Sequence, residues 1–252
     1  GPIQSVQDAL SEKVTAITSS GCFSPQGATS GASVLVVAGG GSGAPQGGGG
    51  GGAGGFRLLA CQTLPGSTIP VTIGAGGAGV GGPAHTPGEN PGNKGSNSVF
   101  GNPANPITSA GGGAGTFRGI CVSNGNGGSG GGSDSHPISP SGGSGNNPPV
   151  SPSQGNPGGK SNANGETPVG SFTIGGGGGG AGASGGDANL TSPSKGTGGA
   201  GGNGSPVTST FGCAPQPFYL SNAPNVGAVA CGVFAGGGGG GNRHASGSPQ
   251  AG

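Results

Sequence analysis

Histidine, cysteine and acidic side chains are the groups in this sequence that could do chemistry, and they are few and scattered. The 252 residues include three histidines, His85, His136 and His244, each in a polar stretch far from the others. A zinc site needs clustered His and Cys ligands at a recognisable spacing. We therefore expect surface histidines, and we predict no metal and no cofactor.

The carboxylates are equally dispersed. A glycosidase needs two of them about 5–10 Å apart across a sugar, and only Glu166 and Asp187, which flank a glycine tract, could meet. Matches to Gly-x-Gly-x-x-Gly lack any βαβ context and carry no weight. The sequence offers no convergent set of titratable groups, so we do not expect an enzyme. The six acidic residues are Asp8, Glu12, Glu89, Asp134, Glu166 and Asp187.

The cysteines do not form a disulfide framework. Their number is odd, and no Cys-x-x-Cys occurs. Each lies beside small or apolar residues, which predicts buried free thiols that act as small hydrophobic groups. Such thiols suit a protein that folds in a reducing compartment. The five are Cys22, Cys61, Cys121, Cys213 and Cys231.

Charge and hydropathy exclude two kinds of partner. Seven Lys and Arg residues spread over the chain make no basic patch, so we expect no nucleic-acid binding. No run approaches 18 apolar residues, so we expect no membrane insertion. Arg57 and Arg118 follow matching Phe residues, and we interpret them as structural caps of backbone carbonyls.

The elements that must position these residues are unusual. The chain has 72 Gly and 23 Pro, and only 28% of it is hydrophobic, which is not the composition of an ordinary globular enzyme. Disorder would combine few apolar residues with high net charge, but the net charge is only +1. We therefore expect an ordered fold that is stabilised by its backbone.

Residues 3–19 differ from the rest because they contain no glycine. Their apolar residues recur at spacings of three and four, which predicts one stripe on a short helix. The stripe is explained by a multimeric stalk, here a homotrimer, or by a single helix that lies on its own domain. We divide the chain into this segment, 1–20, and a glycine-rich domain, 21–252. The stripe consists of Ile3, Val6, Leu10, Val14 and Ile17.

From residue 33 onward, short apolar runs lead directly into glycine. The runs at 34–38, 71–73, 107–110, 172–174 and 233–235 are rich in β-branched residues and predict short strands. Glycine tracts follow them, and another tract precedes a Phe-Arg-Leu-Leu run at 56–59. Structural glycines of these tracts include Gly47, Gly52, Gly111, Gly175, Gly180, Gly236 and Gly241.

Ordered polyglycine is explained best by polyproline-II-like helices that bond to one another. This helix has three residues per turn and no internal hydrogen bonds, so neighbouring segments must supply the partners. A flexible linker is the default for such composition, but linkers do not alternate with strand-like runs. We predict a mostly irregular, all-β-like fold: a packed bundle of polyglycine-II helices with short strands, a short N-terminal helix, and long surface loops at 80–106, 124–170 and 183–210.

Three motifs carry a resemblance to a known family. They are Val-Leu-Val-Val-Ala-Gly-Gly-Gly at 34–41, Gly-Gly-Ala-Gly-Gly-Phe-Arg at 51–57, and Ile-Pro-Val-Thr-Ile-Gly-Ala-Gly-Gly-Ala-Gly at 69–79. The chain resembles the glycine-rich domain of bacteriophage tail fibres and minor tail proteins, and is similar in plan to the tip adhesin of T-even-type long tail fibres. The resemblance implies a virion protein, made in the host cytoplasm, that joins other tail fibre proteins and binds a host outer-membrane protein or glycan.

One segment concentrates aromatic residues outside the strand-like runs. Aromatic anchors dominate protein interfaces, so Phe211, Phe218, Tyr219 and Leu220 are candidate receptor contacts. The alternative is a small apolar plug that closes the end of the bundle. At the level of function, the alternatives to an adhesin are a structural fibre component and an ice-binding protein.

Overall fold

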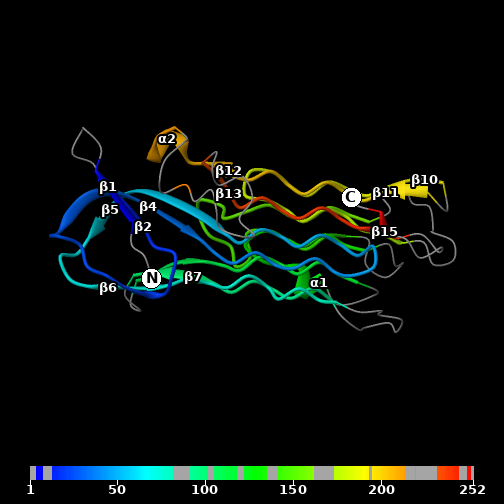
Figure 1. Ribbon diagram of the computed structural model, residues 1–252, viewed down its shortest axis with the longest axis horizontal. Coiled ribbons are helices and arrows are strands. Elements are labelled where there is room, and N and C mark those ends of the chain that lie inside the picture. The colour runs from blue at the N-terminus through cyan, green and yellow to red at the C-terminus, as the bar shows by residue number, and fades with distance from the viewer. Residues whose placement is uncertain are drawn as a thin grey trace.

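The computed structural model is elongated, with short strands at both ends and extended glycine segments running between them along the long axis (Figure 1). The structure describes residues 4–7, 13–81, 91–101, 105–117, 122–134, 141–161, 173–192, 195–213, 219, 232–243 and 249–250. We call the end that holds β3 to β8 the strand end and the opposite end the distal end. Between them lies the glycine-rich body, residues 38–55, 73–81, 91–97, 110–117, 126–134, 141–161, 175–188, 198–204 and 235–241.

Short strands account for most of the regular structure, and the described helices are single turns. The strands are β1 (Gln4–Gln7), β2 (Lys13–Ala16), β3 (Gly21–Phe23), β4 (Thr29–Val37), β5 (Phe56–Leu64), β6 (Ile69–Thr72), β7 (Ser98–Phe100), β8 (Ile107–Ser109), β9 (Thr173–Ile174), β10 (Asn189–Ser192), β11 (Lys195–Thr197), β12 (Ser205–Pro206), β13 (Val233–Phe234), β14 (Asn242–Arg243) and β15 (Pro249–Gln250). The helices are α1 (Val122–Gly125) and α2 (Thr208–Phe211). The predicted non-helical, strand-and-loop fold is confirmed.

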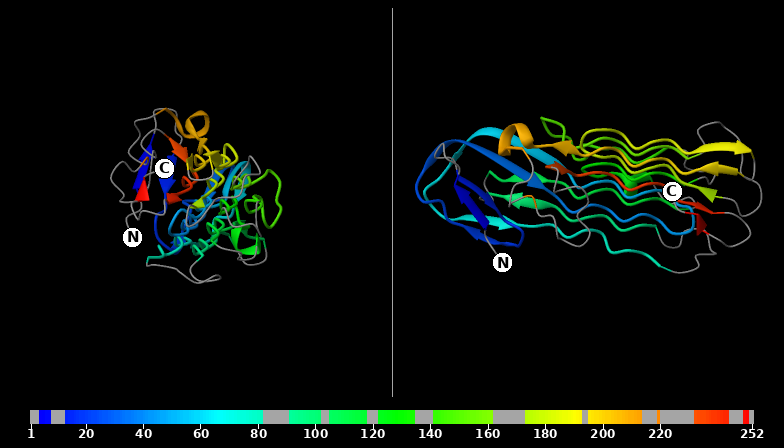
Figure 2. Two further views of the ribbon diagram at one scale, coloured as in Figure 1. Left: turned by 90° about the vertical axis from the view of Figure 1, so that its right-hand side faces the viewer. Right: turned by 45° about the horizontal axis from the view of Figure 1, so that its top comes forward.

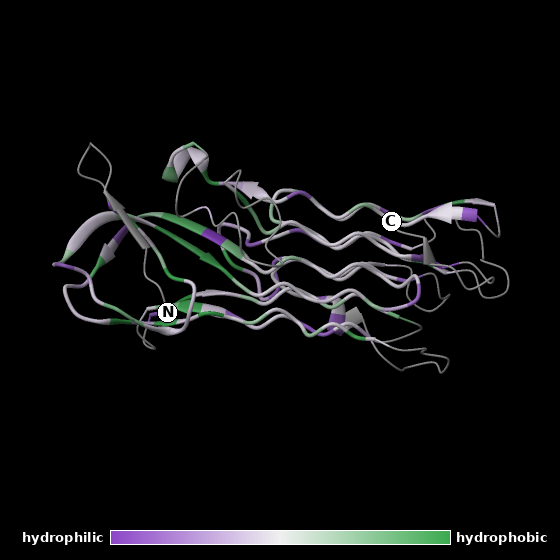
Figure 3. Cartoon of the chain, in the orientation of Figure 1, coloured by the Kyte–Doolittle hydropathy of each residue, from purple (hydrophilic) through white to green (hydrophobic). Residues whose placement is uncertain are grey.

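Among the described residues, the most hydrophobic stretches are concentrated at the strand end (Figure 3). Strands β3, β6, β7 and β8 form an antiparallel sheet in that order, and β4 pairs with β5. Side chains alternate along β4 and β6, so Val34, Val36, Ile69 and Val71 are buried, as the period of two in a strand requires. The apolar runs at 34–38, 71–73 and 107–110 therefore form strands as predicted.

The predicted N-terminal helix is wrong. The described parts of residues 3–19 are β1 and β2, which pair antiparallel with Val6 opposite Val14. A helix this short is marginal in water without a partner, and β-branched residues such as Val14 and Thr15 favour strands. Apolar residues spaced three and four apart therefore do not by themselves distinguish a helix from two short strands that pair antiparallel. Trimer formation through 3–19 and the division at residue 20 stay predictions.

Segments of the glycine-rich body are joined to one another by backbone hydrogen bonds, many of them between residues far apart in sequence. The six residues of 175–180 illustrate this, because every N–H of the segment donates to another segment over 2.7–2.9 Å. Their N–H groups reach 235–241, 130–133 and 183–186, and their carbonyls accept from 199–202, 50–53 and 156–159. Backbone groups, rather than side chains, hold this part of the molecule together.

Glycine is required inside this body because the backbones approach too closely for any side chain. A Cβ on Gly178 would lie 2.0 Å from the carbonyl oxygen of Gly51, and one on Gly49 would lie 1.9 Å from that of Gly132. Most of the predicted structural glycines meet the same barrier: a Cβ on Gly52, Gly111, Gly175 or Gly180 would lie within 2.3 Å of a neighbouring backbone oxygen. Gly236 is an exception, with no neighbour closer than 3.8 Å.

The predicted surface loops contain interior segments, which corrects that part of the sequence interpretation. Residues 127–134 and 154–161 run through the glycine-rich body, and Ser129, Ser133 and Gln154 are at most 1% exposed. Small polar side chains are tolerated there when they satisfy neighbouring backbone groups. Ser133 Oγ, for example, accepts a hydrogen bond from the Ser161 N–H over 2.6 Å.

Replacing Gly178 by Ala should destabilise the fold strongly, because the new Cβ would meet the Gly51 carbonyl at 2.0 Å. Overpacking costs about 1–3 kcal/mol in ordinary cores, and we expect a loss at the upper end or beyond, since backbone cannot rotate away. Gly79→Ala is the control, because no heavy atom lies within 4 Å of its Cβ position. Denaturant unfolding of both variants compares them, and equal stabilities would contradict the role assigned to interior glycine.

Candidate recognition end

Connections between segments gather at the distal end. The described residues on either side of six connections lie there (Figures 1 and 2). Three further connections, which leave from β1, from β7 and from Cys213 after α2, begin at the strand end instead. The six flanking pairs at the distal end are residues 81 and 91, 117 and 122, 134 and 141, 161 and 173, 192 and 195, and 243 and 249.

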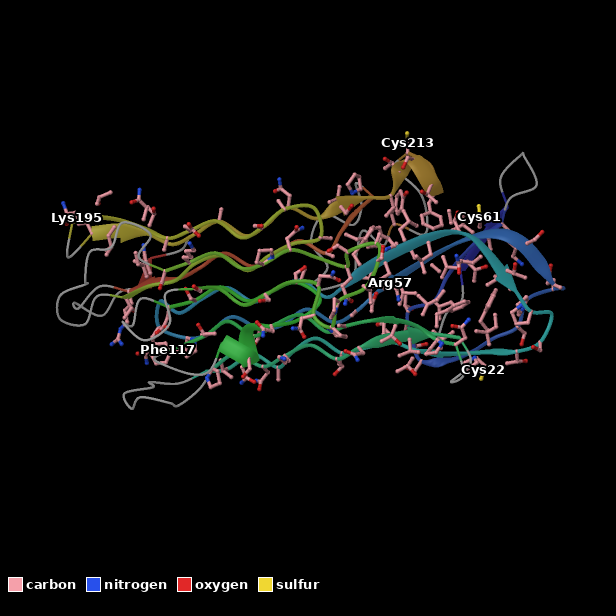
Figure 4. The ribbon with its side chains drawn as sticks, turned by 180° about the vertical axis from the view of Figure 1, so that it is seen from behind. Cys22, Arg57, Cys61, Phe117, Lys195 and Cys213 are labelled. Atoms are coloured by element: carbon pink, nitrogen blue, oxygen red, sulfur yellow. The ribbon has the colours of Figure 1, made fainter. Side chains whose placement is uncertain are left out.

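A small apolar cluster anchors the distal elements. Ile174 of β9 and Ala188 are fully buried, and Leu190 of β10 is 3% exposed. Phe117, at the end of a neighbouring segment, is 1% exposed and lies at the same end (Figure 4). These side chains bury apolar surface where the described glycine segments end, which stabilises the packing of those segment ends.

Polar contacts tie the distal segments to one another. Thr173 Oγ1 donates to the Gln46 carbonyl over 2.7 Å, and the Arg243 guanidinium donates to Gln46 Oε1. The backbone N–H of Lys160 donates to Asp187 Oδ1 over 2.7 Å. A hydrogen bond contributes about 0.5–1.5 kcal/mol net to stability, so these contacts together hold the described segment ends against one another.

The surface that these contacts support is polar. Asn189 and Thr191 of β10 and Lys195 and Thr197 of β11 are exposed, and Figure 4 shows Lys195 at the tip. Amide, hydroxyl and ammonium groups are hydrogen-bonding groups for other polar molecules. The described part of the distal end thus offers directional polar contacts rather than an apolar patch.

The predicted aromatic patch lies at the opposite end. Phe211 ends α2 at the strand end and is half-buried. Tyr219 is 4% exposed, donates its hydroxyl to the Gly212 carbonyl over 2.7 Å, and packs against Phe234 with ring centroids 6.2 Å apart. Tyr219 is therefore part of an apolar plug, and it is not an exposed contact. Phe218 and Leu220 lie outside the described residues.

The junction between strands and glycine-rich body depends on two polar side chains. Arg57 Nη1 donates to the Thr108 carbonyl over 3.3 Å, which confirms its predicted role as a cap (Figure 4); Arg118 lies outside the described residues. Gln154 accepts from the Ala110 N–H over 2.8 Å and donates to the Pro148 carbonyl over 2.7 Å. Sequence reasoning missed Gln154, because nothing local marks one polar residue among Pro, Ser and Gly as buried.

Of the remaining candidate residues, the structure describes only Asp134 and Asp187. Asp134 is 1% exposed and Asp187 holds a backbone N–H; Glu166 and the histidines His85, His136 and His244 lie outside the described residues. No group of three or more potential metal ligands occurs among the residues that the structure describes. Within the same residues, no helix has the length and apolar character needed to cross a membrane.

The prediction of buried thiols is wrong for three cysteines. Cys22, Cys61 and Cys213 are exposed at the strand end (Figure 4). Successive side chains of a strand point to opposite faces, so a neighbouring apolar run does not ensure burial. Cys121 and Cys231 lie outside the described residues.

Comparison with known proteins identifies the family. A model of the glycine-rich domain family matches residues 18–252, so the chain belongs to that family. No match was found among curated proteins or among solved structures.

Replacing Tyr219 by Phe should cost about 1 kcal/mol, the net contribution of one hydrogen bond. Burial, with a further contribution from the charge of Cys213, raises the pKa of Tyr219 above its ordinary value of 10.0. The neutral phenol is therefore favoured in the folded state, and its contribution is complete below pH 10 and is lost as the pH rises through the raised pKa.

Denaturant unfolding of both proteins between about pH 9 and pH 11 measures this effect. The difference in stability between wild type and Tyr219→Phe should shrink as the pH rises. Tyrosinate absorbance reports the same group directly, because the chain has one Tyr. A difference that is constant across this range would contradict the assignment.

Proposed function

We propose that the segments of the glycine-rich body are polyglycine-II helices. In 175–180, N–H groups three residues apart donate to the same neighbour: those of Gly175 and Gly178 both reach 235–241. The other two pairs of that segment behave in the same way. A period of three follows from a helix with three residues per turn, whereas strands alternate with a period of two.

We propose further that the protein is the receptor-binding tip of a bacteriophage tail fibre. The observation that supports this is the gathering of six connections at one end of a body that is cross-linked throughout by backbone hydrogen bonds. Variable binding segments are commonly carried by a rigid scaffold. The strand end, which carries residues 4–7, then faces the other tail fibre proteins, and the distal end faces the host.

The exposed chemistry of the distal end favours a glycan over an apolar protein surface. Asn189, Thr191 and Lys195 present hydrogen-bonding groups, and sugar hydroxyls need such directional partners. A host outer-membrane protein would instead be expected to meet aromatic anchors, and Tyr219 is buried at the other end. The proposed ligand is therefore a surface glycan of the bacterial host.

Binding of the fluorescently labelled chain to a panel of bacterial strains and to their purified surface glycans tests the proposal. The triple variant Asn189→Ala, Thr191→Ala and Lys195→Ala should bind at least about tenfold more weakly, which corresponds to about 1.4 kcal/mol. The matched control replaces the exposed strand-end residues Lys13, Ser30 and Thr63 by Ala and should bind as wild type.

Three outcomes are informative. Binding lost only in the distal variant supports a receptor-binding distal end. Binding lost equally in the strand-end variant would place recognition elsewhere on the molecule. A wild-type chain that binds none of the strains or glycans would contradict the adhesin and leave a structural fibre component as the alternative.

A further inference from the structure

Segment 48–55 lies in the interior and bonds to five neighbours. A helix with three residues per turn points its N–H groups in three directions and its carbonyls in three more. In this segment, two N–H directions and three carbonyl directions are filled by bonds of 2.7–3.1 Å. Its N–H groups at 49, 52 and 55 donate to segment 110–117, and those at 50 and 53 donate to segment 175–180. Its carbonyls accept from three other segments, 38–44, 126–134 and 235–241.

The sixth direction is unfilled by any described residue. The N–H groups of Gly51 and Gly54, three residues apart, have no acceptor among the described residues. The Gly48 N–H, three residues before Gly51, donates to the Pro45 carbonyl within a turn. Segment 175–180 provides the contrast, because all six of its directions are filled. Buried N–H groups are paired in nearly all native structures, so an open row beside an interior segment indicates a missing neighbour.

Two glycines border this open position, although packing within the molecule does not require glycine at either site. Gly43 and Gly238 are exposed. A Cβ on Gly43 would lie 3.8 Å from the Gly51 nitrogen, and one on Gly238 would lie 3.4 Å from it. Neither Cβ would meet any atom of the molecule closer than 3.4 Å. An alanine would therefore fit the isolated chain at both sites, although its methyl group would cover the open N–H row. Gly51 and Gly54 are themselves buried, and glycine at the two bordering sites places no methyl group over their N–H row.

We propose that a second copy of this chain occupies the position with its own segment 235–241. That segment is an outer one, in which Gly236, Gly238 and Gly239 are exposed. Neither 38–44 nor 235–241 contains a charged residue, so two such faces meet without repulsion. The occupant must present carbonyls every third residue, about 9 Å apart in this helix, and a polyglycine-II segment does so.

The resulting dimer is symmetric. Segment 235–241 of each copy borders the open position of its own chain and fills the open position of the partner. The two contacts are therefore the same, and a two-fold axis relates them, as in an isologous interface. Each copy would then complete the sixth direction of the partner's segment 48–55. The inference rests on the hydrogen-bond pattern and is independent of what the distal end recognises.

Sedimentation velocity of the full chain over a range of concentrations tests the dimer. Wild type should associate reversibly, and Gly43→Ala and Gly238→Ala should each weaken association at least about tenfold while melting at the wild-type temperature. The matched control is Gly76→Ala, whose Cβ would have no neighbour closer than 3.6 Å on a segment that does not border segment 48–55; it should dimerise as wild type.

Amide hydrogen exchange gives a second readout that needs no variant. The N–H groups of Gly51 and Gly54 should exchange fast in dilute solution and slowly at concentrations where the dimer forms, while those of Gly49 and Gly52 stay protected throughout. A chain that is monomeric at every concentration would overturn the proposal. Undiminished association of both alanine variants would overturn it too, as would exchange at Gly51 and Gly54 that does not change with concentration.

Discussion

The structure depends on one constraint: each interior backbone N–H and C=O must find its partner in another segment. Extended glycine segments make no hydrogen bonds within themselves, and the body has few large side chains to bury. Its cohesion therefore comes from bonds such as Gly50 N–H to the Gly176 carbonyl and Gly132 N–H to the Gly50 carbonyl. Ordering glycine is entropically costly, and dense cross-linking of this kind offsets that cost.

The same constraint explains why the two ends of the molecule differ. At the strand end, apolar residues such as Val36 and Ile69 bury their side chains in short sheets, and Arg57 and Gln154 satisfy backbone groups where strands give way to glycine. At the distal end, the segments stop and the chain turns back repeatedly. Cross-linking between segments, as in the bond from the Gly241 N–H to the Gly48 carbonyl, holds the described segment ends in place there.

Several features could be read from the sequence because they are local. A β-branched run such as 34–38 favours an extended strand wherever it occurs, and a tract such as 175–180 leaves no side chain to pack. The polar stretches were misjudged, because a segment such as 127–134 looks like any Ser/Gly linker until its neighbours are known. The plug at Tyr219 was one of two readings, and only burial against Phe234 separates them. The exposed thiols of Cys22 and Cys61 were likewise invisible to local reasoning.

By itself, the sequence determined that this chain is a backbone-stabilised, glycine-rich protein with short strands, because composition and the alternation of apolar runs with glycine are local properties. Tertiary structure alone decided which Ser- and Asn-containing segments are interior, that the described parts of residues 3–19 pair as strands, and which connections share an end. The physical reason is that every one of these outcomes depends on partners across the chain, as in the bond from the Gly238 N–H to the Gly51 carbonyl. No local pattern encodes which distant backbone group completes such a pair.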